Sequence, residues 1–121
     1  MIQKRVLVID DHRDGADMLA AALRAKQPGL AVVVGYDGEA AVRLADEHKP
    51  DVAILDLELP SLGGAEAATR IRDARPDRPP LLIALSGNFF KIAKAQQGTL
   101  FDHAFVKPVD LERLVEIVNG G

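Results

Sequence analysis

The feature that most limits how this chain can fold is the alternation of short apolar runs with segments whose apolar residues recur at helical spacing. Five runs are typical of strands in a parallel sheet: Val6–Ile9, Leu30–Val34, Val52–Asp56, Leu81–Leu85 and Ala104–Val106. Each run is followed by a helical pattern, and helical crossovers between parallel strands are right-handed and cover both faces of a sheet. The alternation therefore predicts an α/β domain with a doubly wound, five-stranded parallel sheet.

The helix ends are marked by capping and breaking residues. Helices are expected from Asp14, after Asp37, after Gly63-Gly64, over about Phe90–Gln97 and after Asp110. Asp37 and Asp110 are predicted N-caps, because an Asp side chain accepts hydrogen bonds from the first free N–H groups of a helix. The apolar stripes expected to face the sheet are Ala16, Leu19, Ala20 and Leu23; Ala41, Leu44 and Ala45; Ala67, Ala68 and Ile71; and Leu111, Leu114, Val115 and Val118.

Length and composition exclude several classes of protein. A chain of 121 residues predicts one domain over residues 1–121. The absence of cysteine excludes disulfides, thiolate catalysis and Cys-ligated zinc, and the net charge of −3 argues against a nucleic-acid-binding surface. No apolar run is long enough for a signal peptide or a membrane span, so we expect a cytoplasmic protein that does not bind membranes.

Four of the predicted strands end in polar groups that could do chemistry. Asp10-Asp11 follows the first strand, Asp56 ends the third, Ser86 follows the fourth and Lys107 follows the fifth. Parallel strands place their carboxyl ends at one edge of the sheet, which is where open α/β sheets bind ligands. Each residue alone has an ordinary structural explanation, such as a turn cap for Asp56. Together they predict one site.

The residue types in this site indicate phosphoryl chemistry. Three carboxylates repel one another unless a cation lies among them, and Mg²⁺ prefers such oxygen ligands. Lys107 offers a positive charge and Ser86 a hydroxyl donor to phosphoryl oxygens. Between a metal ion and an ammonium group, Asp56 can act as a nucleophile toward phosphorus, which would give an aspartyl phosphate.

The motif set resembles the receiver domain of two-component response regulators. It comprises Asp10-Asp11, Asp56 followed by Pro60 and Gly64, Ser86-Gly87 and Lys107-Pro108, in the family order and over nearly the whole chain. The resemblance implies a flavodoxin-like fold with strand order 2-1-3-4-5. It also implies a signalling switch whose only catalysis is its own phosphoryl transfer and slow autodephosphorylation, and not an enzyme acting on a separate substrate.

The resemblance assigns a role to each residue of the site. Asp56 would accept a phosphoryl group from a sensor histidine kinase or histidine phosphotransfer protein. Asp11, Asp56 and the backbone carbonyl of Glu58 would bind Mg²⁺, with Asp10 reaching the ion through water. Lys107 would neutralise phosphoryl charge across a cis bond to Pro108, and Ser86 would move toward the phosphoryl group. The surface of the fourth and fifth helices would then contact a downstream effector domain or protein, or form a homodimer.

Several positions depart from the family pattern or remain open. The family usually has an aromatic or histidine residue three positions before the lysine, and this chain has Ala104 there. Phe101 and Phe105 are expected in the core, whereas Phe89 and Phe90 cannot easily both be buried and one could mark a partner surface. The Glu58 carboxylate could affect phosphodonor entry or phosphoryl lifetime, or could simply be solvated. His12 is expected to point to solvent.

Two other functions compete with the switch. Ala104 favours a degenerate receiver that acts as a phosphorylation-independent protein-binding module, whereas the intact set of site residues argues against it. A Mg²⁺-dependent phosphohydrolase with Asp56 as nucleophile would need a second acid/base, for which Glu58 is the candidate, and a substrate pocket. The sequence specifies neither the kinase nor the target, nor whether the domain acts alone or within a longer protein.

Overall fold

The computed structural model describes residues 3–120 and contains five strands and five helices in strict alternation. The strands are β1 (Arg5–Ile9), β2 (Ala31–Gly35), β3 (Val52–Asp56), β4 (Leu81–Ser86) and β5 (His103–Val106). The helices are α1 (Arg13–Lys26), α2 (Gly38–His48), α3 (Gly64–Ala74), α4 (Phe89–Gln97) and α5 (Leu111–Gly120). All four strand pairings are parallel and the order is β2-β1-β3-β4-β5, which confirms the predicted doubly wound sheet.

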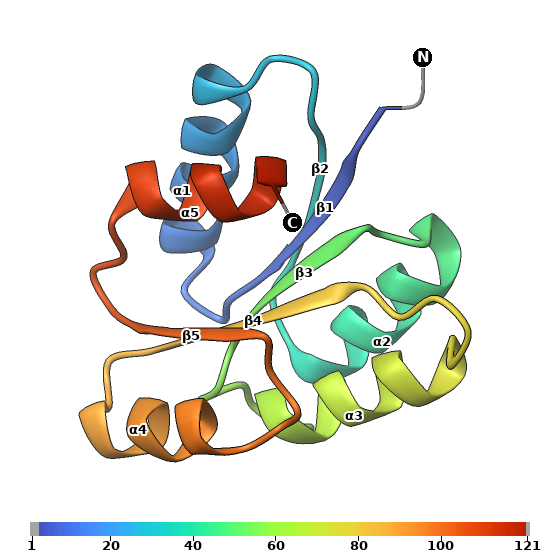
Figure 1. Cartoon of the computed structure of the whole chain (residues 1–121), viewed down its shortest axis with the longest axis vertical. Helices are drawn as coiled ribbons and strands as arrows, with labels where there is room; N and C mark the ends of the chain where they lie inside the picture. The colour runs from blue at the N-terminus through green and yellow to red at the C-terminus, as the bar shows by residue number, and fades with distance from the viewer. Residues whose placement is uncertain (1–2, 121) are drawn as a thin grey trace.

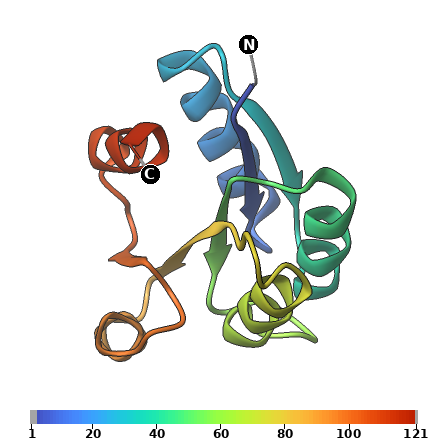
Figure 2. The same ribbon diagram turned by 45° about the vertical axis from the view of Figure 1, so that its right-hand side comes forward.

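The helices cover both faces of the sheet. Helices α1 and α5 lie on one face, and α2, α3 and α4 lie on the other (Figures 1 and 2). Alternate residues of each strand face opposite layers: Val6 and Val8 pack with α1 and α5, whereas Leu7 and Ile9 pack with α2 and α3. The central strand β3 is buried along its whole length, so Asp56 is reached only from the carboxyl edge of the sheet.

The capping predictions are confirmed. The Asp37 carboxylate accepts a hydrogen bond from the backbone N–H of Ala40 at 2.7 Å, and the Asp110 carboxylate accepts from Glu112 at 3.0 Å. Lys49 adopts the left-handed conformation with φ of 48° and ends α2 before Pro50. Such caps satisfy backbone groups that a helix end leaves without intrahelical partners.

Several element boundaries differ from the sequence prediction by one residue. Strand β2 runs from Ala31 instead of Leu30, α1 begins at Arg13 instead of Asp14, and α4 begins at Phe89 because Asn88 is its N-cap. Strands β4 and β5 each extend one residue further, to Ser86 and from His103. Hydrogen bonds between neighbouring strands and at helix caps set these limits, and apolar patterning does not report them.

The predicted core is largely confirmed. In α5, Ile117 is also buried, while Val115 and Leu111 are only partly buried against the same cluster.

Among the described residues, no helix has the length and apolar character needed to cross a bilayer.

Candidate functional site

The carboxyl edge of the sheet brings the predicted site residues together. Asp10 follows β1, Asp56 ends β3, Ser86 ends β4 and Lys107 follows β5. Asp10, Asp56 and Ser86 are buried, and the side chain of Asp56 is only 3% exposed. Because the central strands end at this edge in register, residues as many as 97 positions apart meet there.

Lys107 lies between two of the carboxylates. Its Nζ atom is 2.7 Å from Asp10 Oδ2 and 2.7 Å from Asp56 Oδ2, so it donates a hydrogen bond to each. Burial acts to lower the pKa of Lys107, but the two hydrogen bonds and the charges of both carboxylates outweigh it, and the net pKa is raised. The ammonium group is therefore positively charged at neutral pH.

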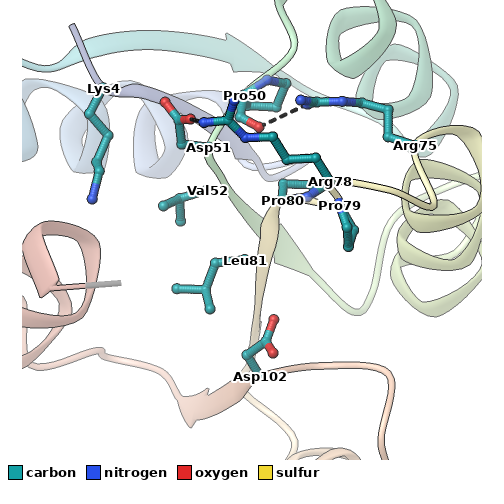
Figure 3. A pocket seen from close by; sticks show the side chains of 10 residues that line it. All are labelled: Lys4, Pro50, Asp51, Val52, Arg75, Arg78, Pro79, Pro80, Leu81 and Asp102. Atoms are coloured by element: carbon teal, nitrogen blue, oxygen red, sulfur yellow. Dashed lines mark hydrogen bonds and ion pairs between the residues drawn. The ribbon is translucent and has the colours of Figure 1, made fainter. Parts of the chain in front are cut away.

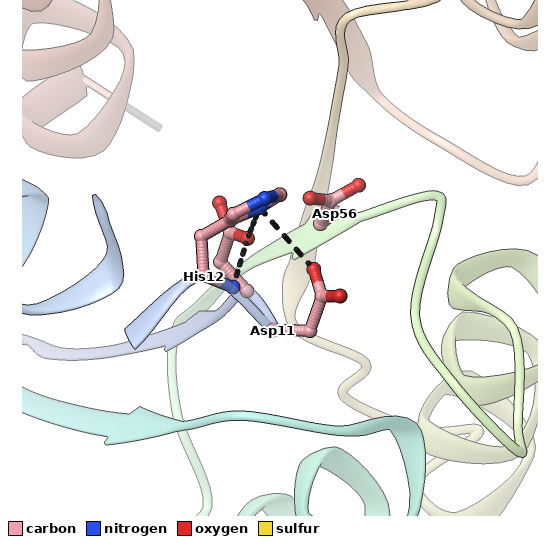
Figure 4. A group of neighbouring side chains, drawn as sticks. Asp11, His12 and Asp56 are labelled. Carbon is pink, nitrogen blue, oxygen red and sulfur yellow. Dashed lines mark hydrogen bonds and ion pairs between the residues drawn. The ribbon is translucent and has the colours of Figure 1, made fainter. Parts of the chain in front are cut away.

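The acidic groups form a cluster beside this ammonium group. Asp10, Asp11, Asp56 and His12 each place one ligand atom within 4.8 Å of the others. Figure 4 shows Asp11 and His12 beside Asp56, the last residue of β3. The His12 side chain is mostly exposed, as expected, yet its Nδ1 atom lies 3.5 Å from a carboxylate oxygen of both Asp10 and Asp11. One lysine cannot neutralise three carboxylates, so the cluster keeps an excess of negative charge.

The donor set fits Mg²⁺. Three carboxylates supply hard oxygen ligands, and Asp11 is exposed, which leaves an open side for water and for a phosphoryl oxygen. Lys107 occupies one oxygen of Asp10 and one of Asp56, and the second Asp56 oxygen accepts a hydrogen bond from the backbone N–H of Glu58 at 2.8 Å. The site therefore combines a carboxylate cluster that can bind a cation with the positively charged ammonium group of Lys107.

The backbone around Asp56 is tightly packed. A Cβ atom placed on Gly64, the first residue of α3, would lie 2.3 Å from the Asp56 carbonyl oxygen. On the other side of the site, the Lys107 backbone N–H donates to the Ser86 carbonyl at 2.8 Å, and the Lys107–Pro108 peptide bond is cis, as expected. The first contact holds the start of α3 against the end of β3, and the hydrogen bond from Lys107 to Ser86 joins the ends of β4 and β5.

The Glu58 carboxylate has partners that the sequence did not predict. It accepts a hydrogen bond from the Ser86 hydroxyl and lies 3.7 Å from Lys91 Nζ of α4. Burial acts to raise the pKa of Glu58, but hydrogen bonding with Ser86 and Asp56 and the charge of Lys91 favour the carboxylate more, so its net pKa is lowered. The Glu58 side chain is exposed, but its carboxylate contacts Ser86 and Lys91 and is not simply solvated. No sequence signal specified this contact, because Glu58 and Ser86 are 28 positions apart.

Ala104, the residue of β5 that departs from the pattern of the receiver family, is a small side chain in a small buried cluster. Ala104 is buried against Ala84 and Ile92 beneath α4, whereas Phe105 points to the opposite face and packs with the cluster of α1 and α5. Phe105 and Phe101 are partly buried in core clusters, as predicted. Phe89 and Phe90 are 69% and 83% exposed, so neither belongs to the core.

A separate hollow of about 380 Å³ lies at the amino edge of the sheet, at the far end from Asp56 (Figure 3). Its wall includes Lys4, Asp51, Arg75 and Arg78, and Arg75 donates a hydrogen bond to the Pro50 carbonyl at 3.1 Å. None of the predicted site residues lines this hollow, so the candidate site is confined to the carboxyl edge.

Comparison with known proteins gives consistent matches. The model of the response regulator receiver domain family matches residues 6–119. The transcriptional regulatory protein PrrA of Mycobacterium tuberculosis is 37% identical over 112 residues, which is 92% of this chain and 46% of PrrA. The alkaline phosphatase synthesis transcriptional regulatory protein PhoP of Bacillus subtilis is 32% identical over 88% of this chain and 43% of its own length. The chain thus spans less than half the length of these curated relatives.

A solved structure agrees with the sequence matches. The receiver domain of the sensor histidine kinase PA1611 from Pseudomonas aeruginosa superposes with a TM-score of 0.83 and 27% identity, covering 98% of this chain and 97% of that domain. That structure has a magnesium ion coordinated in its active site cleft.

Proposed function

The chain belongs to the response regulator receiver domain family of two-component systems, and from this premise we propose that it is a phosphorylation-dependent switch with Asp56 as phosphoacceptor. The observation that carries the proposal is the position of Lys107 Nζ, 2.7 Å from both Asp10 and Asp56, beside a carboxylate cluster. We treat residues 1–121 as one receiver domain, which accepts phosphoryl groups from a sensor histidine kinase or a histidine phosphotransfer protein.

In the proposed reaction an Asp56 oxygen attacks the phosphorus atom of a phosphohistidine. The new phosphorus–oxygen bond forms as the phosphorus–nitrogen bond breaks, and the nitrogen keeps the electron pair. A donor ring protonated on its other nitrogen leaves as neutral imidazole. Lys107 stabilises the charge on the phosphoryl oxygens, and the Ser86 hydroxyl can donate a hydrogen bond to one of them.

The residues that would hold Mg²⁺ are Asp11 and Asp56 through their side chains, Glu58 through its backbone carbonyl, and Asp10 through a water molecule. When bound, the ion would neutralise the charge of the carboxylates and of the incoming phosphoryl group. The hydrogen bond from the Glu58 N–H to Asp56 supports this assignment, because it fixes the orientation of the nucleophilic carboxylate.

We propose that the domain signals through the surface of α4 and α5. An effector domain, a partner protein or a second copy of the chain would bind there. The exposed rings of Phe89 and Phe90 at the start of α4 support this choice, since large exposed apolar groups are typical of interaction sites. Because the chain covers 46% of the length of the first two relatives, the effector can be a further domain of the same polypeptide.

Intact mass after incubation with acetyl phosphate tests the switch, with and without Mg²⁺ and with the Asp56→Asn variant as control. We expect one added phosphoryl group that requires both the metal ion and Asp56. Absence of the adduct, followed by absence of Mg²⁺-dependent beryllofluoride binding, would contradict the proposal. The better assignment would then be the phosphorylation-independent binding module, whereas steady hydrolysis of phosphate esters would indicate a phosphohydrolase.

A further inference from the structure

The Ser86 hydroxyl is fully engaged within the protein. Its oxygen accepts a hydrogen bond from the backbone N–H of Asn88 at 2.9 Å, and its proton is donated to the Glu58 carboxylate. Ser86 itself has no exposed surface. The hydroxyl therefore meets its hydrogen-bonding needs without any contribution from solvent or from a bound group.

A serine hydroxyl has only one proton to donate. In this structure the Ser86 hydroxyl donates that proton in its hydrogen bond to Glu58, so it cannot at the same time donate a hydrogen bond to a phosphoryl oxygen on Asp56. We propose that Glu58 is a positioning residue that competes with the phosphoryl group for Ser86 and thereby favours the unphosphorylated arrangement. The inference rests on the proposed function and adds a regulatory residue to it.

The location of Glu58 is set by the site itself. Its backbone N–H donates to Asp56 Oδ1 at 2.8 Å at the end of β3, and its side chain reaches Ser86 at the end of β4. The carboxylate also lies 3.7 Å from Lys91 Nζ, so it connects the loop after Asp56 with α4. Movement of Ser86 toward Asp56 would break a contact that involves β4, α4 and the loop between β3 and α3.

The contact can couple phosphorylation to α4 in a chain that has no ring at the usual position of β5, three residues before Lys107. The residue at that position is Ala104, whose methyl group packs against Ala84 and Ile92 and has no alternative rotamer to adopt. Glu58 and Lys91, in contrast, have long side chains that can exchange partners when Ser86 moves. The proposed competition thus gives α4 a direct dependence on the state of Asp56.

The affinity for beryllofluoride in the presence of Mg²⁺, measured by titration calorimetry, tests the competition. A hydrogen bond to a charged group contributes enough that removing the competing carboxylate in Glu58→Ala is expected to tighten binding about 10-fold. Glu58→Gln keeps a weaker neutral acceptor and should tighten binding less. Glu66→Ala is the matched control, because it removes an exposed carboxylate of α3 that pairs with Arg70.

A double-mutant cycle separates competition from simple charge repulsion. In a Ser86→Ala background, Glu58→Ala should no longer tighten beryllofluoride binding, because residue 86 then has no hydroxyl group for which Glu58 could compete. The inference would be overturned if Glu58→Ala tightened beryllofluoride binding equally with and without the Ser86 hydroxyl. It would also be overturned if Glu58→Ala tightened binding in neither background. Neither result would affect the proposed function, which fails only if the wild-type protein binds no beryllofluoride and acquires no phosphoryl group.

Discussion

Lys107 determines the charge balance of the site. Its ammonium group makes one hydrogen bond to Asp10 and one to Asp56, and both of these acceptors are buried. Without it, neither carboxylate would have a lysine or arginine partner among residues 3–120. Buried charges that lose their partner are strongly destabilising, because the desolvation cost of the remaining charge is no longer offset.

Replacement of Lys107 by methionine should therefore lower stability most when divalent cations are absent. We expect Lys107→Met to reduce the free energy of unfolding by about 3 kcal/mol in EDTA. Saturating Mg²⁺ should recover part of the loss, because the ion neutralises the same carboxylates. Urea unfolding under both conditions measures the effect, with the exposed Lys94→Met of α4 as control. Equal losses in the two variants would show that Lys107 has no special role in the charge balance.

At the scale of secondary-structure elements, the loop between β3 and α3 places Asp56 by close backbone packing. Gly63 and Gly64 are adjacent, yet their surroundings differ. A Cβ atom on Gly63 would meet nothing within 4 Å, whereas one on Gly64 would lie 2.3 Å from the Asp56 carbonyl oxygen and 2.8 Å from Leu57 Cα. The start of α3 can approach the end of β3 only because residue 64 has no side chain.

The pair Gly64→Ala and Gly63→Ala tests this packing with the same chemical change at neighbouring positions. Gly64→Ala should lower the free energy of unfolding by about 2–3 kcal/mol, since the backbone of β3 must shift to admit the methyl group. Gly63→Ala should change it by no more than about 0.5 kcal/mol, because its φ of −63° suits any L-residue. Thermal or urea unfolding of both variants provides the comparison. Similar losses in both would contradict the proposed close approach.

At the scale of the whole molecule, ligand binding at the carboxyl edge should stabilise the entire fold. The site joins residues from β1, β3, β4 and β5, so a group bound there is lost when any of these strands separates. A ligand that binds only the folded state raises the free energy of unfolding by an amount that grows with the ratio of its concentration to its dissociation constant.

Beryllofluoride with Mg²⁺ should therefore raise the free energy of unfolding of the wild-type domain. At 100 times the dissociation constant the expected gain is about 2.7 kcal/mol, measured by urea unfolding. The Asp56→Asn variant should show no gain beyond that from Mg²⁺ alone, because the acceptor carboxylate is missing. A gain of the same size in both proteins would place the binding site away from Asp56.

Local sequence patterns alone determined the elements of this protein and the composition of its site. Apolar periodicity identified every strand and helix, and the predicted strand limits and helix starts lie within about one residue of those observed. Asp37 and Asp110 were recognisable as caps because capping depends on neighbours only. The polar strand ends could be grouped from the sequence, because parallel strands share their carboxyl edge. The strand order itself came from resemblance to the receiver family, and the sheet confirms it.

Only the tertiary structure decided which atoms meet within that site. Periodicity does not encode the register and approach of distant segments, so it could not show Lys107 between Asp10 and Asp56 or Gly64 against the Asp56 carbonyl. The same holds for Glu58, whose carboxylate could have pointed to solvent but accepts a hydrogen bond from the Ser86 hydroxyl and lies near Lys91. Apart from the contact of Gly64 with Asp56, these contacts join elements far apart in the chain, and the packing of the whole fold fixes their geometry.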